Sequence, residues 1–597
     1  MKKLLILLFI APTLSPAQTT IGLDPLIQNV YGRNVQRLNG YWNYLVDPLE
    51  NGYYDYRRQP TENGFFKDIE VDNITTYKEY DFNLAPKMGI PGDWNTQNSD
   101  LFFYEGTVWF RQIFDYQPSD QKAFLYFGAI NYEAIIWLNG KKVGEHTGGY
   151  TPFNFEVTRH LTAGKNTLIV KVDNKRSVDG VPTNNFDWFN YGGITRDVLL
   201  VQVPSQFIQT YTFQLRKGTT DVIQIQVKLN QKEAGRLVTV EIPELKIKKT
   251  ETTDPQGFVT FETKADPILW SPENPKRYRV EIASETDKVA DNIGFRQIET
   301  RGRDILLNGT PIFLKGISIH EEAPFRNGRI YSTEEARILL NWAKELGCNF
   351  IRLAHYPHNE QMVREAEQMG LMVWSEIPVY WTIQWEKPEV YANALNQLHE
   401  MMERDQNRAN IIIWSVANET PHGEARDIFL SSLIKAAREK DDSRLISMAM
   451  ERKDKSNTVL SVQDEMSPYV DVISFNQYVG WYDGTKEKLD RVSWEIDYDK
   501  PIIITEFGAG ALFGLHGDDT LIWTEEYQAD LYRKTLKMID ERMPPLAGLS
   551  PWILKDFRSS RRLLPQVQDG FNRKGLFSDR GERKQAFYIL QEWYRKR

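Results

Sequence analysis

Two patterns of apolar and polar positions divide the chain near residue 295. Before it, apolar and polar residues alternate in short runs, for example from Ile223 to Leu229, where every second residue is apolar. This alternation has the period of a β-strand with one buried face. After it, short runs that are apolar throughout alternate with stretches of helical period. We therefore expect β-sandwiches first, and then a parallel sheet covered by helices.

The first part divides into two predicted sandwiches. Residues 18–203 hold short β-rich stretches between turns, and Asn139-Gly140 suits a type I′ hairpin because both residues tolerate positive φ. This pattern favours a jelly roll. Within it, residues 184–196 are rich in aromatics and glycine, so they either pack as a loop or lean on a neighbouring domain. Residues 204–294 are typical of an immunoglobulin-like sandwich and show no cluster of catalytic residue types, so we expect a spacer.

Residues 295–597 are predicted to form a (β/α)₈ TIM barrel. Ser332 and Glu335 have the spacing of a capping box, which begins a helix. Apolar residues at helical spacing follow from Ala336 to Leu346, and Gly347 is the expected stop. Eight apolar stretches have the length of strands: Phe313–His320, Phe350–Leu353, Leu371–Trp374, Ile411–Val416, Leu445–Met448, Val472–Phe475, Ile502–Thr505 and Leu549–Leu554. In such a barrel the active site lies at the C-terminal ends of the strands.

The first seventeen residues are predicted to be a signal peptide. Lys2 and Lys3 precede an apolar run too short to be a permanent membrane helix, and the small residues at positions 15–17 suit a signal peptidase. We expect export to a periplasm or to the medium. The single cysteine, Cys348, stands between a predicted helix and strand and favours a buried structural thiol.

The charge balance of the chain limits the classes of partner that it could bind. The net charge is −8 and no long basic stripe offsets it, which disfavours nucleic acid and anionic membrane as partners. No phosphate-cradling glycine loop and no nucleophile elbow are visible. The sequence therefore predicts an enzyme without a cofactor, although it leaves the formation of a homo-oligomer open.

Polar residues at the predicted strand ends carry the candidate chemistry. Glu419 and Glu506 each follow an apolar strand, the fourth and the seventh, so they would face each other across the barrel mouth. A facing carboxylate pair is what double-displacement glycoside hydrolysis needs, with one group protonated and the other ionised. His320, His355, Glu376 and Asp556 lie at other strand ends and could hold a metal, but their spacing fits no metal signature. We expect no metal.

Several segments resemble glycoside hydrolase family 2. They are WSVANE at 414–419, TEFG at 505–508 and NFIRLAHYP at 349–357. The resemblance implies the domain order predicted above. It also implies that Glu419 is the general acid/base, that Glu506 is the nucleophile, and that Asn418 bonds the sugar 2-hydroxyl.

Within that family, four segments are most similar to bacterial β-glucuronidases: FDWFNYGG at 186–193, HEE at 320–322, NQYVGWY at 476–482 and NRKG at 572–575. The last matches an Asn-x-Lys motif, so the resemblance implies that Asn572 and Lys574 grip a substrate carboxylate. A buried anion does need a cation and a donor in place of its water. The other residues that the resemblance places around the sugar are Asp187, His320, Tyr478, Tyr482 and Trp552.

The resulting hypothesis is an exported, retaining, exo-acting β-glucuronidase acting on oligosaccharides or glycosides. A β-galactosidase of the same family is the first alternative and would make no use of Lys574. A noncatalytic carbohydrate-binding protein is the second, and the two glutamates count against it. The short segment from Pro378 to Lys387 predicts a site that no long loop covers. The sequence leaves open the aglycone and the role of the cluster Arg558, Arg561 and Arg562.

Overall fold

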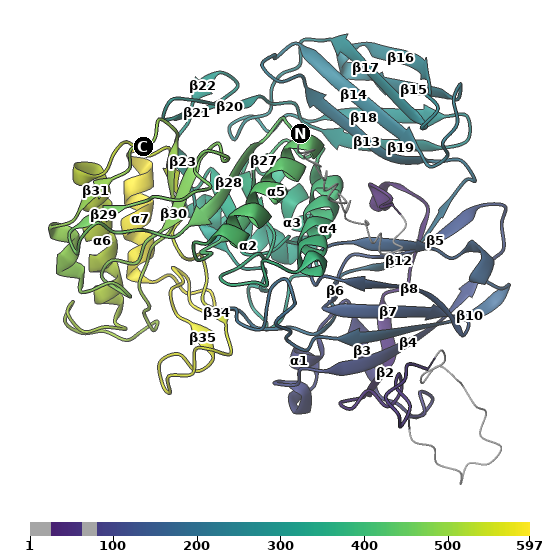
Figure 1. Cartoon of the computed structure of the whole chain (residues 1–597), viewed down its shortest axis with the longest axis horizontal. Coiled ribbons are helices and arrows are strands. Elements are labelled where there is room, and N and C mark those ends of the chain that lie inside the picture. The colour runs from purple at the N-terminus through teal and green to yellow at the C-terminus, as the bar shows by residue number, and fades with distance from the viewer. Residues whose placement is uncertain (1–24, 62–79) are drawn as a thin grey trace, which may run out of the picture.

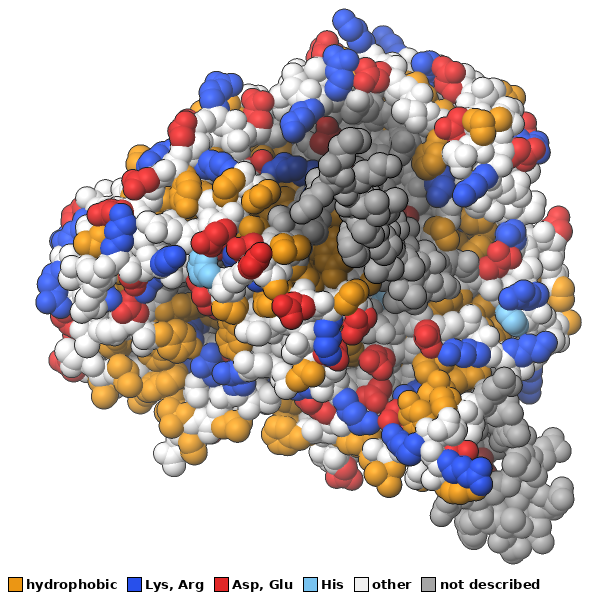
Figure 2. Space-filling model, viewed as in Figure 1, with side chains coloured by type: hydrophobic (Ala, Val, Ile, Leu, Met, Phe, Trp, Pro, Cys, Tyr) orange, Lys and Arg blue, Asp and Glu red, His pale blue; other side chains and the backbone are white. Residues whose placement is uncertain are grey.

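The computed structural model describes residues 25–61 and 80–597 (Figure 1). Three units follow one another along the chain, and in the view of Figure 1 the first sandwich lies below the second, with the barrel beside them. The predicted signal peptide lies outside the described residues. Among those described, no helix is both long and apolar enough to cross a membrane. On the face in view in Figure 2, acidic and basic side chains are interspersed.

The first unit is a jelly-roll sandwich. A six-stranded sheet in the order β3-β2-β4-β10-β7-β8 packs against a four-stranded sheet in the order β1-β12-β5-β9 through one buried apolar cluster. The bounds are β1 (Val35–Arg37), β2 (Gly40–Val46), β3 (Lys87–Ile90), β4 (Thr107–Tyr116), β5 (Lys122–Phe127), β6 (Ile130–Asn131), β7 (Glu133–Leu138), β8 (Lys141–Thr147), β9 (Phe153–Glu156), β10 (Gly164–Asp173), β11 (Gly193–Ile194) and β12 (Val198–Val203). Between β7 and β8, Asn139 and Gly140 both have positive φ, at 50° and 77°, as the predicted hairpin requires.

The second unit is an immunoglobulin-like sandwich of a three-stranded sheet, β13-β14-β17, and a four-stranded sheet, β16-β15-β18-β19. The bounds are β13 (Ile208–Leu215), β14 (Val222–Leu229), β15 (Leu237–Ile242), β16 (Ile247–Thr252), β17 (Phe258–Lys264), β18 (Tyr278–Ser284) and β19 (Lys288–Ile293). It is attached to the base of the barrel: Arg408, just before the fourth barrel strand, forms a buried ion pair with Asp291 at 2.6 Å. Contacts of this kind fit a supporting unit.

The third unit is the predicted parallel barrel. Its strands are β23 (Leu314–Lys315), β24 (Ser318–Ile319), β25 (Phe350–Leu353), β26 (Met372–Glu376), β27 (Ile411–Asn418), β28 (Leu445–Met450), β30 (Ile473–Asn476), β32 (Ile502–Glu506) and β33 (Gly548–Leu549). The first predicted strand is split, and its two halves close the barrel because β23 pairs with β33 and β24 with β25. The helices are α2 (Thr333–Leu346), α3 (Glu360–Gln368), α4 (Pro388–Asp405), α5 (Glu424–Lys440), α6 (Glu525–Arg542) and α7 (Gln585–Arg595).

Helix α2 follows the sequence pattern closely. Ser332 is its N-cap and accepts a bond from the Glu335 backbone N–H at 3.2 Å, and Gly347 ends it at φ 96°. The five apolar positions of the predicted stripe are all buried. Only half of the capping box forms, because the Glu335 carboxylate binds Arg326 at 2.6 Å instead of turning back to Ser332.

The structure corrects two details of the barrel. The eighth strand was predicted over Leu549–Leu554 but covers only Gly548–Leu549, because Pro551 lacks the N–H that a central strand needs. In addition, no α-helix follows β28 or β30. Those connections hold β29 (Val459–Ser461), β31 (Ser493–Glu495) and a short 3₁₀ turn. The segment after β28, ERKDKSN at 451–457, has no apolar stripe that could bury a helix on the barrel.

The aromatic segment 184–196 of the jelly roll packs against the barrel mouth. It is therefore a contact between domains and not only a packed loop of the jelly roll. Arg196 forms a buried ion pair with Glu321 at 3.0 Å, and the Tyr191 hydroxyl donates to Glu322 at 3.0 Å. The ring of Trp188 lies 5.7 Å from that of His355. The first domain therefore supplies part of the wall around the C-terminal ends of the barrel strands.

Candidate active site

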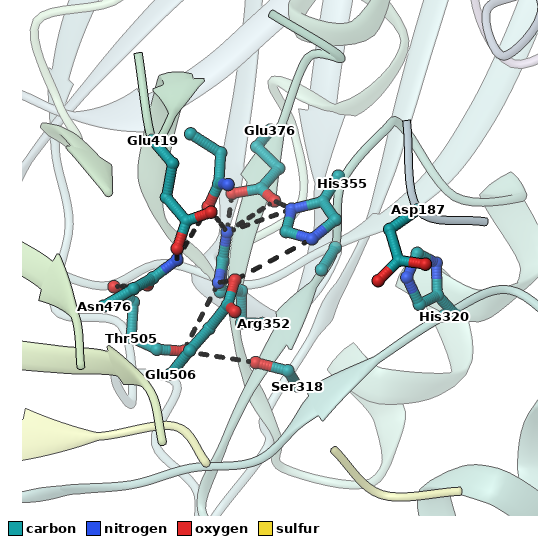
Figure 3. A network of polar contacts seen from close by, with 12 residues as sticks. Asp187, Ser318, His320, Arg352, His355, Glu376, Glu419, Asn476, Thr505 and Glu506 are labelled. Atoms are coloured by element: carbon teal, nitrogen blue, oxygen red, sulfur yellow. Dashed lines mark hydrogen bonds and ion pairs between the residues drawn. The ribbon is translucent and has the colours of Figure 1, made fainter. Parts of the chain in front are cut away.

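Two glutamates line one cavity at the barrel mouth. Glu506 is the last residue of β32 and Glu419 follows β27 directly, so parallel strands bring both carboxylates to the same end of the barrel (Figure 3). The cavity has a volume of about 300 Å³. Glu419 has a left-handed backbone, with φ 49°, and its N–H donates to Ala449 at 2.8 Å. Such a conformation is costly for a residue with a side chain and persists where its surroundings fix it.

Glu506 is held by a cation and a hydroxyl. Arg352 donates to its Oε1 at 2.7 Å, and the Tyr478 hydroxyl donates to its Oε2 at 2.6 Å. Each of the two carboxylate oxygens thus accepts one hydrogen bond, and the bond from Arg352 is charge-assisted. Glu506 is 4% exposed, so little water competes with these partners. This carboxylate is thus fixed in position.

Glu419 forms no ion pair with a cation among the described residues. Trp381 donates to its Oε2 and Asn476 to its Oε1, each at 2.8 Å. Burial, followed by the negative charge of Glu506, raises the pKa of Glu419 to about 7, although the two donors oppose the change. One buried carboxyl can therefore hold a proton near neutral pH while its neighbour is ionised, which is the division of roles that acid and nucleophile need.

A third glutamate, Glu376, binds Arg352 and fixes the position of its guanidinium. It accepts two bonds from the guanidinium, at 3.0 and 3.1 Å, and one from His355 at 3.0 Å. Burial opposes its ionisation, but Arg352 and His355 lower the pKa of Glu376 to about 2. Arg352 also donates to Asn418 Oδ1 at 2.7 Å, which orients that amide. The Nδ2 of Asn418 is buried without a partner among the described residues.

Lys574 and Asn572 lie together in the same cavity, on the segment after the eighth strand. The Lys574 ammonium is buried, donates to the Tyr482 hydroxyl at 2.7 Å, and lies 4.6 Å from the centre of that ring. No carboxylate of the described residues is within ion-pair distance of it. Burial lowers the pKa of Lys574. A buried ammonium without an anion is costly, so this position favours an anionic ligand.

Asp187, from the jelly roll, lines the same cavity beside Asn572. Its carboxylate accepts bonds from Ser559 Oγ at 2.6 Å, Arg562 Nε at 3.1 Å and Asn572 Nδ2 at 3.3 Å. Asp187 thereby neutralises Arg562, and Asp556 pairs with Arg573 of the same basic segment. The Asp569 carboxylate accepts a backbone N–H and joins no ion pair among the described residues.

The other residues expected around the sugar do not all line the cavity. Tyr478, Tyr482 and Trp552 line the cavity, whereas His320 does not. His320 lies behind the wall among aromatic rings, 4.1 Å from Phe557 and 5.2 Å from Trp552, and burial lowers its pKa well below 6.5. An uncharged imidazole can pack among aromatic rings in this way. The family resemblance implied that His320 lines the sugar pocket, but in the structure it lies behind the residues that line the cavity.

Five residues that line the cavity were not assigned a role at the sugar from the sequence. They are His355, Tyr380, Trp381, Arg561 and Arg562. Trp381 was the hardest to foresee, because its contact with Glu419 depends on a left-handed backbone, with φ 55°, and on a bond from its N–H to Asn418 at 2.9 Å. The adjacent aromatics Tyr380 and Trp381, in the short connection after β26, were the available signal.

The structure brings together one group with metal-ligand chemistry among the described residues: His422, Asp464 and Glu465. Arg426 donates to both oxygens of Asp464, at 2.8 and 2.7 Å. These oxygens are therefore engaged in an ion pair. The four residues considered for a metal in the sequence, His320, His355, Glu376 and Asp556, do not form such a group. One of them, Asp556, is engaged in an ion pair with Lys584 at 2.7 Å.

Comparison with known families matches the whole sequence of domains. The model "Glycosyl hydrolases family 2, TIM barrel domain" matches residues 298–596, "Glycosyl hydrolases family 2, sugar binding domain" matches 35–204, and "Glycosyl hydrolases family 2" matches 206–296. A β-glucuronidase of Streptococcus agalactiae is 31% identical over 544 residues, which cover 81% of this chain and 87% of the relative. A β-glucuronidase of Sus scrofa is 28% identical over 571 residues, covering 85% and 84%.

Comparison with solved structures also finds enzymes of this kind. A β-glucuronidase of an uncultured Clostridium species superposes with a TM-score of 0.80 at 26% identity, covering 96% of this chain and all of the other. A β-galacturonidase of the same family from Eisenbergiella tayi superposes with a TM-score of 0.78 at 25% identity, covering 95% and 97%. Both of these named activities concern glycosides of an acidic sugar.

Proposed function

The chain belongs to family 2 of the glycosyl hydrolases, and within it we propose a retaining β-glucuronidase that releases terminal β-D-glucuronate from the non-reducing ends of oligosaccharides. The single observation that carries the sugar assignment is Lys574, a buried ammonium in the catalytic cavity with no carboxylate partner among the described residues. The C6 carboxylate of a uronic acid would supply that partner, with Asn572 beside it as a further donor.

The proposed reaction is a double displacement. Glu506 attacks the anomeric carbon while Glu419 gives its proton to the glycosidic oxygen, so that the aglycone leaves as an alcohol and a glycosyl-enzyme ester forms. Glu419, now ionised, takes a proton from water, which attacks the anomeric carbon and frees Glu506. Arg352 and Tyr478 keep Glu506 in line, and the unpartnered Nδ2 of Asn418 suits the sugar 2-hydroxyl.

The geometry favours removal of one sugar at a time. A cavity of about 300 Å³ is at the lower end of the usual range for ligand sites, roughly 300 to 1,000 Å³, and suits one sugar residue. Helix α4 begins at Pro388, so only residues 377–387 follow β26, and no long loop from this connection covers the cavity.

We predict that oligosaccharides ending in β-linked glucuronate are shortened by one residue per event, with kcat/KM at least equal to that for a small aryl glucuronide. The reason is that an uncovered cavity leaves room for the rest of the chain. Chromatography of timed digests would measure free glucuronate and the shortened product. Internal cleavage products, or a strong preference for the aryl glucuronide, would count against this proposal.

The proposed acid also sets a pH dependence. Because Glu419 must carry a proton and its pKa is raised to about 7, kcat/KM should fall about tenfold per pH unit above that value. A dinitrophenyl glucuronide, whose leaving group needs no protonation, should show a much weaker decline. Initial rates from pH 5 to 9 on both substrates test this. A flat profile for the poorer leaving group between pH 7 and 9 would be incompatible with the assigned acid.

We further propose that the protein is exported. The support is the N-terminal pattern alone, Lys2 and Lys3 followed by an apolar run and then by small residues up to Ala17. The mature chain would begin near Gln18. N-terminal sequencing of the protein from its own host decides this, since a chain that retains residues 1–17 would refute cleavage there.

A further inference from the structure

A second cation of the cavity, Arg561, forms no ion pair with a described carboxylate. Its neighbours along the chain differ: Arg562 pairs with Asp187, and Arg573 pairs with Asp556 at 3.3 Å. The Arg561 guanidinium lies over the ring of Trp381, 4.9 Å from its centre, and donates to the side-chain oxygen of Asn185. A guanidinium has five N–H donors, so most of them remain for a ligand.

Arg561 lies on the leaving-group side of the cavity. Trp381, on which it stacks, donates to the Oε2 of Glu419 at 2.8 Å. A general acid must contact the glycosidic oxygen, so the group attached to that oxygen leaves past Glu419 and its neighbour Trp381. Lys574 packs against different side chains, the rings of Tyr478, Trp481 and Tyr482. The two cations without carboxylate partners therefore serve different parts of a substrate.

The backbone that carries Arg561 is tied down from the jelly roll. Arg176 donates to the Ser560 hydroxyl at 3.2 Å, and the Ser559 hydroxyl donates to Asp187 at 2.6 Å. Arg561 is exposed, yet it is anchored by its own contact with Asn185. A cation that is held in place before binding loses less freedom when an anion arrives.

We infer that Trp381 and Arg561 form a leaving-group subsite for a ring that bears a carboxylate or a sulfate. The guanidinium, which is held over the indole, presents its fork of donors to the two acidic oxygens of that ring. The second residue of the oligosaccharide substrate is then itself acidic. This inference rests on the proposed function, since it concerns the aglycone of the same reaction.

Paired aryl β-glucuronides test the inference. In each pair one aglycone is anionic and the other is its neutral amide: 4-carboxyphenyl against 4-carbamoylphenyl, and 4-sulfophenyl against 4-sulfamoylphenyl. Because a charge-assisted contact in a partly exposed site is worth roughly a factor of ten, the unaltered enzyme should favour the anionic member about tenfold in kcat/KM, mainly through KM. The preference should shrink as salt rises from 20 to 500 mM.

Variants separate binding from support of the fold. Arg561→Gln should lower kcat/KM about tenfold more on the anionic aglycones than on their neutral amides, which removes the preference, and Arg561→Lys should keep part of the preference. Arg558→Gln is the matched control. Arg558 lies in the same segment but stacks on Phe571 and bonds Asn327 outside the cavity, so this variant should keep the full preference.

The outcomes are distinguishable from those of the proposed function. If none of the four glucuronides is hydrolysed, the proposed function fails. If the neutral amides are hydrolysed but the unaltered enzyme shows no anionic preference, only the subsite is refuted. An equal loss on anionic and neutral aglycones in Arg561→Gln would also refute it, because Arg561 would then support the cavity and not the aglycone. The carboxylate and sulfonate pairs report separately which acid is preferred, the sulfonate standing in for a sulfate.

Discussion

Replacement of Glu506 by glutamine is expected to lower kcat on an aryl β-glucuronide by roughly four to six orders of magnitude. The amide can keep the contacts with Arg352 and Tyr478 but cannot form the ester with the sugar. Steady-state rates measure the loss, and circular dichroism and thermal unfolding show whether the variant is folded. A folded Glu506→Gln enzyme with rates within tenfold of the unaltered enzyme would exclude this residue as the nucleophile.

The companion variant separates the two carboxylates. Glu419→Ala should lose roughly two to four orders of magnitude on a poor leaving group but far less on a dinitrophenyl glucuronide, because only the former needs a proton. Azide is small enough to enter the space left by the side chain and attack the glycosyl-enzyme. The expected product is the β-glycosyl azide, identified by NMR. An α-azide would show inversion and contradict the double displacement.

Replacement of Lys574 is expected to have the largest effect on which sugar the enzyme accepts. Lys574→Ala should lower kcat/KM on a β-glucuronide about a hundredfold or more, because a desolvated charge pair with the C6 carboxylate is lost. Any activity on the matching neutral glycoside should change little. Lys574→Met is a second variant that keeps the length of the side chain and most of its volume, so a loss shared by both variants reports the charge.

The opposite pattern is equally informative. The Lys574 ammonium donates to Tyr482 and lies near three aromatic rings, so it could hold the cavity wall together without touching a substrate. Equal losses on acidic and neutral sugars, with reduced thermal stability, would show that role. The β-galactosidase alternative would then take first place.

Local patterns predicted much of this fold. Ser332, the apolar stripe of α2 and Gly347 act within one helix, so their spacing alone located it. The buried strands β27 and β32 could be located because each begins with an unbroken apolar run, residues 411–414 and 502–504, and ends at a polar residue, Asn418 and Glu506. The eighth strand was overextended, because the apolar run through Leu554 masked the effect of Pro551 on pairing.

The site was less predictable where it depends on contacts between distant parts of the chain. The two glutamates could be named from strand ends, but the partner of Arg562 could not. Asp187 stands 375 positions earlier and in another domain. Trp381 was missed for a related reason, since only the folded turn aims its indole at Glu419. Sequence spacing carries no record of such contacts.

The central claim is that this cavity recognises an acidic sugar. The most direct measurement is kcat/KM of the unaltered enzyme on four 4-nitrophenyl β-glycosides: glucuronide, galacturonide, glucoside and galactoside. The account predicts that the glucuronide exceeds both neutral sugars by at least about a hundredfold and also exceeds the galacturonide. A galactoside or glucoside hydrolysed as well as the glucuronide would contradict it.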